Sequence, residues 1–139
     1  MMTDVLTPEQ RRRCMAAIKG RDTKPEMVVR RIVHGMGYRY RLHAADLPGK
    51  PDLVFRSRKK VIFVHGCFWH RHNCNLGKPV PATRPEFWQK KLNANRDRDR
   101  RNRQKLRQLG WAVLLVWECQ TRRQSAEQLA IRLKAFLEG

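Results

Sequence analysis

Two continuous apolar runs dominate the hydrophobic pattern of this chain. Residues 61–64 read Val-Ile-Phe-Val, and residues 111–117 read Trp-Ala-Val-Leu-Leu-Val-Trp. Short runs rich in β-branched and aromatic side chains are typical of buried strands. Residues 53–55, Leu-Val-Phe, reach the first run through the basic turn at residues 56–60, which predicts a β-hairpin. Residues 38–42 alternate in polarity and predict one more strand.

Three helix starts share one pattern, in which a threonine is followed closely by proline and, three positions later, by glutamate or glutamine. These threonines are Thr7, Thr23 and Thr83. The pattern combines an N-cap, a proline in the first turn and a capping box. It predicts helices over residues 8–19, 24–36 and 85–109, the last two ending at Gly37 and Gly110. A fourth helix is capped by Ser125, and its apolar stripe consists of Leu129, Leu133, Phe136 and Leu137.

The predicted order of elements is two helices, three strands, a long helix, a strand and a helix. This order favours an α/β fold in which a mixed β-sheet is flanked by helices. The 139 residues contain neither internal repeats nor a Gly/Ser-rich linker, so we expect one domain over residues 1–139. Because the first predicted helix is basic and poor in apolar residues, residues 1–20 are expected to form a loosely held N-terminal arm.

The charge balance is strongly basic, with 31 Lys and Arg against 12 Asp and Glu and a formal net charge of +19. Such an excess repels itself and implies a polyanionic partner, with nucleic acid as the leading candidate. A membrane surface fits less well, because the sequence has neither a basic amphipathic helix with a strong apolar face nor an apolar run near 18 residues. The first residues lack the apolar core of a secretory signal, so a cytoplasmic location is expected.

The middle of the long predicted helix, residues 93–105, has a single apolar residue and is dense in arginine. Its arginines are Arg96, Arg98, Arg100, Arg101 and Arg103. They indicate either a solvated helical face or contact with nucleic-acid phosphates. Lys91 and Asn95 are four residues apart and therefore share one face of this helix.

The loop after the first apolar run is rich in metal-capable residues and large aromatics. In a reducing compartment, cysteines are more often metal ligands or free thiols than disulfides, and structural zinc takes four nitrogen or sulfur ligands. The predicted zinc ligands are Cys67, His72 and Cys74 from the loop and Cys119 from the end of the second run. His70 is an alternative to His72, and Cys14 is expected to remain a free thiol. A site with four protein ligands has no open position, so its role is structural.

Asp52 and Met15 each allow two interpretations. Asp52 stands at the start of one predicted strand, a single hairpin away from His65 at the end of the next. It is either a turn residue or part of a metal or acid–base site. Met15 either packs the arm onto the domain or inserts into a DNA groove. Glu26, in turn, occupies the position of a capping-box glutamate.

Several longer motifs resemble the very-short-patch repair (Vsr) mismatch endonucleases. They are Arg-Asp-Thr at 21–23, Leu-Pro-Gly-Lys-Pro-Asp at 47–52, Val-Ile-Phe-Val-His-Gly-Cys-Phe-Trp-His-Arg-His-Asn-Cys at 61–74, Pro-Ala-Thr-Arg-Pro-Glu-Phe-Trp at 81–88 and Leu-Gly-Trp-Ala-Val-Leu-Leu-Val-Trp-Glu-Cys at 109–119. They cover nearly the whole chain in order and are specific to that family.

The resemblance implies a restriction-endonuclease-like core and a nick on the 5′ side of the thymine in a T:G mismatch in double-stranded DNA. Such mismatches arise when 5-methylcytosine deaminates, and the nick starts repair. The implied enzyme is a monomer of the bacterial cytoplasm, associated with the nucleoid, and its arm over residues 1–20 is mobile without DNA. Mismatch-repair proteins are candidate partners.

The resemblance also implies roles for residues at the site. Asp52 would bind catalytic Mg²⁺, helped by the backbone carbonyl of Val64, which stands where other members can have threonine. His65 would activate water, His70 would assist at the scissile phosphate and Glu26 would support the site. The resemblance likewise implies a structural zinc ion with four protein ligands, namely Cys67, His72, Cys74 and Cys119.

On the DNA side, the resemblance implies that aromatic side chains enter the base stack from the major groove. These are Phe68, Trp69 and Trp88, while Met15 matches a minor-groove wedge. Unstacking costs least at a mismatch, so such wedges select weakly stacked sites. Lys91 and Asn95 fall where the family contacts the mismatched pair, and we add Arg96, Arg98 and Arg101 as phosphate contacts.

Two other function classes compete with a nuclease. One is a non-catalytic DNA-binding module stabilised by zinc, in which Asp52 is only a turn residue. The other is an RNA-binding protein that uses the same charge and aromatics. The presence of Asp52, His65 and His70 together favours the nuclease over the module, and a preference for duplex DNA would separate it from the RNA-binding class.

Overall fold

The computed structural model describes residues 22–74 and 80–139, and their helices and strands confirm an α/β chain. The elements are α2 (Lys24–Gly35), β1 (Arg41–Leu42), β2 (Leu53–Phe55), the 3-10 turn η1 (Arg56–Arg58), β3 (Lys60–His65), α3 (Pro85–Gln108), β4 (Ala112–Trp117), α4 (Glu118–Arg123) and α5 (Ala126–Glu138). The helix predicted over residues 8–19, with Cys14 and Met15, lies outside the described residues. In the part of the chain that is described, no helix has the length and apolar character needed to cross a bilayer.

The four strands form one mixed sheet in the order β1-β2-β3-β4. β2 pairs antiparallel with both β1 and β3, whereas β4 pairs parallel with β3 from Lys60↔Ala112 to His65↔Trp117. The predicted hairpin is present, and Lys59, with a φ of 58°, makes the left-handed turn between η1 and β3. The carboxyl ends of β3 and β4 therefore lie side by side, at His65 and Trp117.

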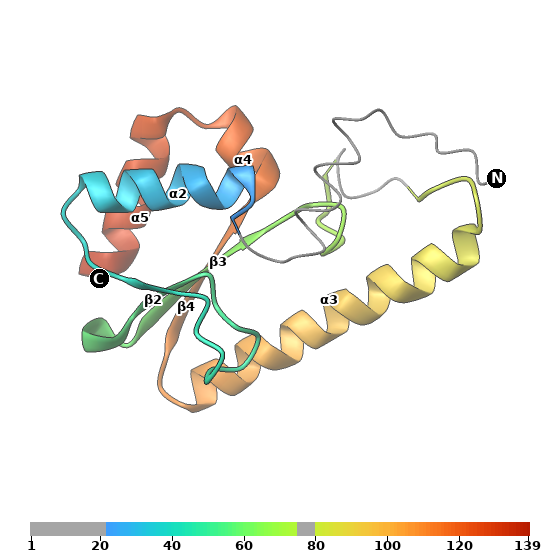
Figure 1. The fold of residues 1–139 in the computed structure, drawn as a ribbon, viewed down its shortest axis with the longest axis horizontal. Helices are drawn as coiled ribbons and strands as arrows, with labels where there is room; N and C mark the ends of the chain where they lie inside the picture. The colour runs from blue at the N-terminus through green and yellow to red at the C-terminus, as the bar shows by residue number, and fades with distance from the viewer. Residues whose placement is uncertain (1–21, 75–79) are drawn as a thin grey trace.

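Helices cover both faces of this sheet (Figure 1). α2 and α5 lie on one face, where Ile62 and Val64 of β3 pack in a core with Val29 and Leu133. α3 lies along the other face, and Val61 and Phe63 share a second core there with Leu106, Trp111 and others. Because β3 is covered on both sides, its sequence is continuously apolar rather than alternating.

The capping signals are confirmed at two helices and wrong at one. The Thr23 side chain accepts a hydrogen bond from the Glu26 N–H at the start of α2, and Ser125 and Gln128 form a complete capping box on α5. At α3 the N-cap is Arg84, in a left-handed conformation, and not Thr83. Pro85 occupies the first helical position of α3 with its fixed φ, so this helix begins without a side-chain cap. In α2 the proline of the same pattern, Pro25, is the second helical residue, so α3 begins one position later within the pattern.

Three further differences concern strands and a short helix. Only Arg41–Leu42 of the strand predicted at residues 38–42 pairs in the sheet. β4 is less buried than predicted, with Val116 its only fully buried residue, because it is the edge strand of the described sheet. α4 was not predicted, and it begins directly where β4 ends, with the Gln120 side chain accepting from the Trp117 N–H at 3.0 Å.

A lysine from β3 closes the carboxyl end of α5. Lys60 Nζ donates to the carbonyl oxygens of Phe136, Leu137 and Gly139 at 2.7, 3.0 and 2.7 Å. These carbonyls have no partner within their own helix, and a cation near a helix C-terminus also interacts favourably with the helix dipole. The contact joins the last helix to the central strand.

Lys60→Met should therefore lower the free energy of unfolding by about 1–3 kcal/mol, the range for hydrogen bonds made by a charged group. Methionine keeps most of the apolar stem and removes only the donors. Lys105→Met, at an exposed position on α3, is the matched control and should change little. Denaturant unfolding measures both, and an equal effect of the two variants would contradict the role of Lys60.

Candidate active site and metal cluster

The turn at residues 47–51 leads into β2 and places Asp52 directly before that strand. Gly49 has a φ of +77°, and a Cβ there would lie 3.1 Å from the Cβ of Asn102 on α3, so only glycine lets this turn approach the helix so closely. Asp52 is buried, and its Oδ2 accepts a hydrogen bond from the Val64 N–H at 2.6 Å. The carboxylate at the start of β2 is thus joined to the end of β3, beside His65.

Burial raises the pKa of Asp52 well above its ordinary value, and the neighbouring Glu26 carboxylate raises this pKa further. The hydrogen bond from Val64 acts in the opposite direction but is outweighed. Two close carboxylates in a buried position repel each other, and a divalent cation would relieve that repulsion. The site therefore fits an oxygen-binding cation such as Mg²⁺.

Glu26 is almost fully buried, at 1% exposure, and is held from several sides. Its Oε2 contacts His43 Nε2 at 2.9 Å and Arg30 at 3.3 Å, while Oε1 accepts from the Asp22 N–H at 3.2 Å. The side chain is thus directed toward the site and the residues that support it, and no bond from it to the Thr23 N–H is seen. No motif in the sequence predicts the contact between His43 and Glu26.

His65 lies at the carboxyl end of β3 and is 5% exposed. Its ring stacks on that of His70, with centroids 3.8 Å apart and planes 7° apart. Burial lowers the pKa of His65 well below its ordinary value, and the charges of His70 and Arg103 lower it further. The imidazole is therefore neutral near pH 7. Its Nδ1 is buried and has no hydrogen-bond partner among the described residues.

Asp99 of α3 is paired with His70 Nδ1, a contact that the sequence analysis missed. A carboxylate partner holds an imidazole in one orientation and favours the proton on the nitrogen that faces it. A signal for this role does exist in the sequence. Asp99 lies seven residues from both Leu92 and Leu106, two fully buried leucines, so this one acid shares their inward face of a basic helix.

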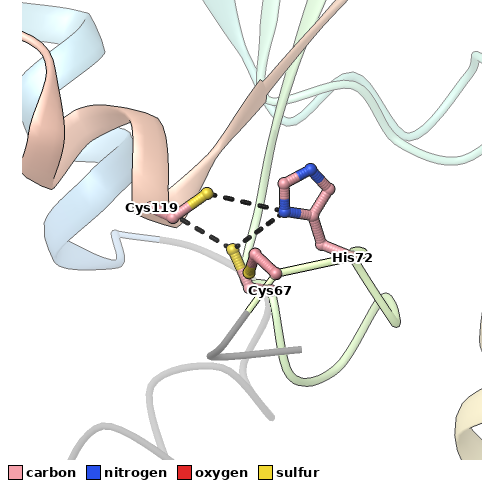
Figure 2. Close-up of side chains that lie close together, drawn as sticks. Cys67, His72 and Cys119 are labelled. Atoms are coloured by element: carbon pink, nitrogen blue, oxygen red, sulfur yellow. Dashed lines mark hydrogen bonds between the residues drawn. The ribbon is translucent and has the colours of Figure 1, made fainter. Parts of the chain in front are cut away.

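The four residues predicted as zinc ligands come together in a second cluster. The ligand atoms of Cys67, His72, Cys74 and Cys119 all lie within 4.8 Å of one another. Figure 2 shows Cys67 and His72 from the loop after β3 facing Cys119 at the start of α4, with His72 Nδ1 at 3.7 Å from Cys67 Sγ and 3.5 Å from Cys119 Sγ. His70 is not in this group and belongs to the cluster with His65 and Asp99.

The geometry and chemistry of this cluster fit a tetrahedral metal site. Zn–S and Zn–N bonds of about 2.3 and 2.0–2.1 Å give a sulfur–nitrogen edge of roughly 3.6 Å, close to both distances above. Burial raises the pKa values of Cys67 and Cys119 and lowers the pKa of His72. Neutral histidine is the ligand form, and a bound cation would favour the two thiolates that burial disfavours.

The predicted wedge aromatics form one group beside the candidate active site. Trp69 lies 5.2 Å from Phe68 and 5.9 Å from Trp88, measured between ring centroids. The exposed Phe87 joins the group through Trp88 and was not predicted. All three predicted rings are only partly buried, so they combine mutual packing with access to a partner.

The predicted DNA-contact residues of α3 lie on more than one side of the helix. Asn95 Nδ2 donates to the Trp69 carbonyl at 3.4 Å and Lys91 Nζ lies 5.8 Å from the Trp88 ring centre, so both face the aromatic group. Arg98 donates to Asn95 Oδ1 at 2.6 Å on the same side. Arg101 is exposed and Arg96 is partly buried.

A family model for the DNA mismatch endonuclease Vsr matches residues 3–76 of this chain. The chain is also 45% identical to the DNA mismatch endonuclease Vsr of Escherichia coli, over 99% of this chain and 90% of that protein. This chain belongs to the Vsr family of DNA mismatch endonucleases. Further relatives are the type II nicking enzyme V.XorIIP of Xanthomonas oryzae, at 50% identity over 86% of this chain and 87% of that enzyme, and V.NmeAIP of Neisseria meningitidis, at 41% over 86% and 84%.

Membership of the Vsr family makes the chain a DNA endonuclease, a hydrolytic enzyme whose partner is DNA. The basic helix and the partly exposed aromatic group are consistent with such a partner. Of the interpretations left open by the sequence, the non-catalytic module and the RNA-binding protein do not match these relatives.

Proposed function

We propose that the protein nicks one strand of double-stranded DNA on the 5′ side of the thymine in a T:G mismatch, in a magnesium-dependent reaction that starts very-short-patch repair. The observation that carries the proposal is the hydrogen bond from the Val64 N–H to Asp52, which sets a buried carboxylate beside His65. The proposal includes a restriction-endonuclease-like core, with the mixed sheet carrying the site at one end. We also propose that the whole chain is a single domain that acts as a monomer. The described residues hold one such site, and a monomer with one site would cut one strand rather than both.

Asp52 is the proposed magnesium ligand, and the Val64 main-chain carbonyl is a second. Glu26 raises the negative charge at this point and is fixed there by Arg30 and His43. A bound magnesium ion supplies charge neutralisation at the scissile phosphate and stabilises the leaving oxygen. The chain itself supplies oxygen ligands at a buried, defined position.

His65 is the proposed general base, and His70 the group that assists at the scissile phosphate. The low pKa of His65 keeps its imidazole neutral, so a ring nitrogen can accept a proton from water. Asp99 is paired with His70 Nδ1 and would hold its ring in one orientation toward the phosphate. The stack of the two rings makes both histidines parts of one reaction centre.

We propose that Phe68, Trp69 and Trp88 enter the base stack beside the mismatch, while Lys91 and Asn95 contact the mismatched pair. The contacts of Asn95 with Trp69 and of Lys91 with Trp88 support this division, because they fix two polar groups next to the rings. Arg96, Arg98 and Arg101 are proposed phosphate contacts, and Met15 a minor-groove wedge. Mismatch-repair proteins are proposed partners in the bacterial cytoplasm, at the nucleoid.

The cluster of Cys67, His72, Cys74 and Cys119 is the proposed structural zinc site. Four protein ligands leave no position for substrate, so the ion would hold the loop after β3 against the start of α4. The Cys67 N–H also donates to Glu118 of α4 at 3.3 Å, which supports the same connection.

A nicking assay on strand-labelled duplexes tests the proposed function. One T:G duplex in several sequence contexts, the matched C:G and T:A duplexes and the thymine-containing strand alone are each incubated with and without Mg²⁺. We expect a single cut, 5′ of the mismatched thymine, only in the T:G duplex and only with magnesium. Cutting of matched duplexes at the same rate would overturn the mismatch specificity, and equal cutting under chelation would overturn the metal requirement.

His65→Ala should lower the nicking rate by ~10²–10⁴, the usual contribution of general acid–base catalysis. Single-turnover kinetics on the T:G duplex measure the rate. His34→Ala, at an exposed position on α2, is the control and should keep the wild-type rate. If His65→Ala lowers the rate by no more than about threefold, the loss is far smaller than that range, and His65 takes no part in the chemistry.

Trp69→Ala should weaken binding to the T:G duplex by roughly tenfold to a hundredfold, the equivalent of 1–3 kcal/mol for one aromatic–base stack. Binding to the matched duplex should change much less, because no base step is opened there. Phe87→Ala removes an exposed ring outside the proposed wedge and serves as the control. Equal losses on both duplexes, with an unchanged circular dichroism spectrum, would refute the wedge.

A further inference from the structure

Four aromatic rings form a continuous series that joins the candidate active site to the metal cluster. The series begins with His70 stacked on His65, as described above. His65 meets Trp117 in an edge-to-face arrangement, with centroids 5.3 Å and planes 73° apart. Trp117 in turn stacks on His72, with centroids 4.2 Å and planes 18° apart. Trp117 is therefore the ring that contacts a proposed catalytic histidine on one side and a proposed metal ligand on the other.

The position of Trp117 follows from the sheet. His65 and Trp117 are the last pair in the parallel register of β3 and β4, so their side chains lie next to each other on one face. The Trp117 N–H donates to Gln120 Oε1 at 3.0 Å, and Arg132 donates to the same oxygen at 2.8 Å. Arg132 also donates to the Leu115 carbonyl at 2.8 Å. The end of β4 is thus held by the sheet, by α4 and by α5.

His65 depends on its neighbouring rings for its orientation. Its buried Nδ1 has no hydrogen-bond partner in the part of the chain that is described, whereas Nδ1 of His70 is paired with Asp99. Besides His70 and Trp117, the Phe63 ring lies 5.4 Å from the His65 ring, measured between centroids. Edge-to-face contacts are directional, because the positive edge of one ring faces the negative face of the other. Contact with Trp117 therefore limits rotation of the imidazole where a hydrogen bond at Nδ1 does not.

We propose that Trp117 is a positioning residue, which holds the His65 ring in its reactive orientation and is itself held by the His72 ring. The proposal rests on the proposed role of His65 in nicking. A metal bound at the cluster would fix His72, so the same cluster would support the reaction through Trp117 in addition to holding the loop. Because a shift of about 1 Å in a reacting group can cost about a hundredfold in rate, a ring that touches no substrate can still control catalysis.

Trp117→Met tests the proposal, because methionine keeps an apolar, space-filling side chain and removes the flat ring. With protein in saturating excess over a T:G duplex, we expect the nicking rate to fall roughly tenfold to a hundredfold. Binding of that duplex without magnesium and the zinc content should stay at the wild-type level, because no proposed DNA contact or metal ligand is changed. Trp117→Phe restores a ring next to both histidines and should recover most of the lost rate.

Trp111→Met is the matched control. It makes the same change at the opposite end of β4, where Trp111 packs in the second core and contacts Lys59. It should lower the free energy of unfolding and leave the saturating nicking rate unchanged. Equal rate losses in Trp111→Met and Trp117→Met would attribute the effect to the sheet as a whole and would overturn the proposal. A loss in Trp117→Met that is confined to DNA binding would overturn it as well.

Gln120→Ala provides a second reading if Trp117→Met fails to fold or loses zinc. It removes the acceptor of the Trp117 N–H and changes no ring and no proposed metal ligand. We expect the saturating rate to fall roughly threefold to tenfold, the equivalent of one hydrogen bond, with DNA binding unchanged. A wild-type rate in Trp117→Met, or in Gln120→Ala where the first variant gives no reading, would overturn the proposal.

Nuclear magnetic resonance separates this proposal from the proposed function. Wild-type protein should show nuclear Overhauser contacts between the rings of His65 and His70 and between those of Trp117 and His72. Trp117→Met should lose the contact between the rings of His65 and His70, and Trp111→Met should keep it. If the wild-type protein does not nick the T:G duplex, the proposed function fails, and these contacts still decide the role of Trp117. Persistence of the contact between His65 and His70 in Trp117→Met would overturn that role.

Discussion

Asp52→Ala is expected to reduce nicking of a T:G duplex to the level seen without protein, while binding of the same duplex stays close to wild type. Among the described residues, the carboxylate is the one buried acid hydrogen-bonded to the strand that carries His65, and its removal would leave the site without its proposed magnesium ligand. The aromatic group is built from other elements and is untouched by the change. A nicking assay on strand-labelled duplex measures the first property. A binding measurement without magnesium, on the same protein preparation, measures the second.

Two variants sharpen this experiment. Asp52→Asn keeps the size of the side chain and removes the charge, so equal inactivity of Asp52→Asn and Asp52→Ala attributes the loss to charge rather than packing. Asp46→Ala removes an exposed acid paired with Arg56 and should leave nicking unchanged. If Asp52→Ala nicks the duplex at the wild-type rate in magnesium, the active site lies elsewhere.

Cys119→Ser is expected to abolish stoichiometric zinc binding and to cause a large loss of folding stability. Structural zinc binds with apparent free energies of about 10–16 kcal/mol in small zinc domains, and that binding is coupled to folding. Here the cluster connects the loop after β3 with α4, so loss of the ion would release both. Elemental analysis of the purified protein and thermal unfolding measure the two effects, with one zinc per wild-type chain expected.

Cys14→Ser is the matched control, because it makes the same chemical change at the cysteine outside the predicted zinc set. It should keep one zinc per chain and the wild-type midpoint of unfolding. A wild-type protein that is folded and contains no zinc would contradict the metal assignment. A Cys119→Ser variant that keeps a full complement of zinc would instead show that another residue completes the site.

Local patterns were sufficient to predict the centre of the fold. The apolar runs predicted β3 and β4, and the basic turn predicted the hairpin that brings Asp52 to the end of β3. The short spacing of Cys67, His72 and Cys74 placed three possible ligands in one loop, and Cys119 was found because it follows the neighbouring strand. Each of these inferences depended on residues that are close in sequence or lie at the ends of paired strands.

Contacts between distant elements were not predictable in the same way. The pairing of His70 with Asp99 depends on how the loop crosses α3, and the contact between His43 and Glu26 depends on how α2 rests against the segment before β2. Choosing between His70 and His72 needed the same information, because both are within reach along the chain. The start of α3 at Pro85 was predicted correctly, but its cap was not, because the N-cap is Arg84 and proline can begin a helix without a side-chain cap.

The loop after β3 has a consequence for attempts to change the specificity of this enzyme. With a metal bound by Cys67 and His72, the four residues between these ligands form a small closed ring that holds Phe68, Trp69 and His70 together. Insertions or altered spacing within the ring would move the proposed wedge aromatics and the proposed catalytic histidine at the same time. Trp88 and Lys91 meet the same aromatic group from a regular helix that does not pass through the ring. Libraries built at those helical positions should therefore retain cutting more often than libraries built in the loop.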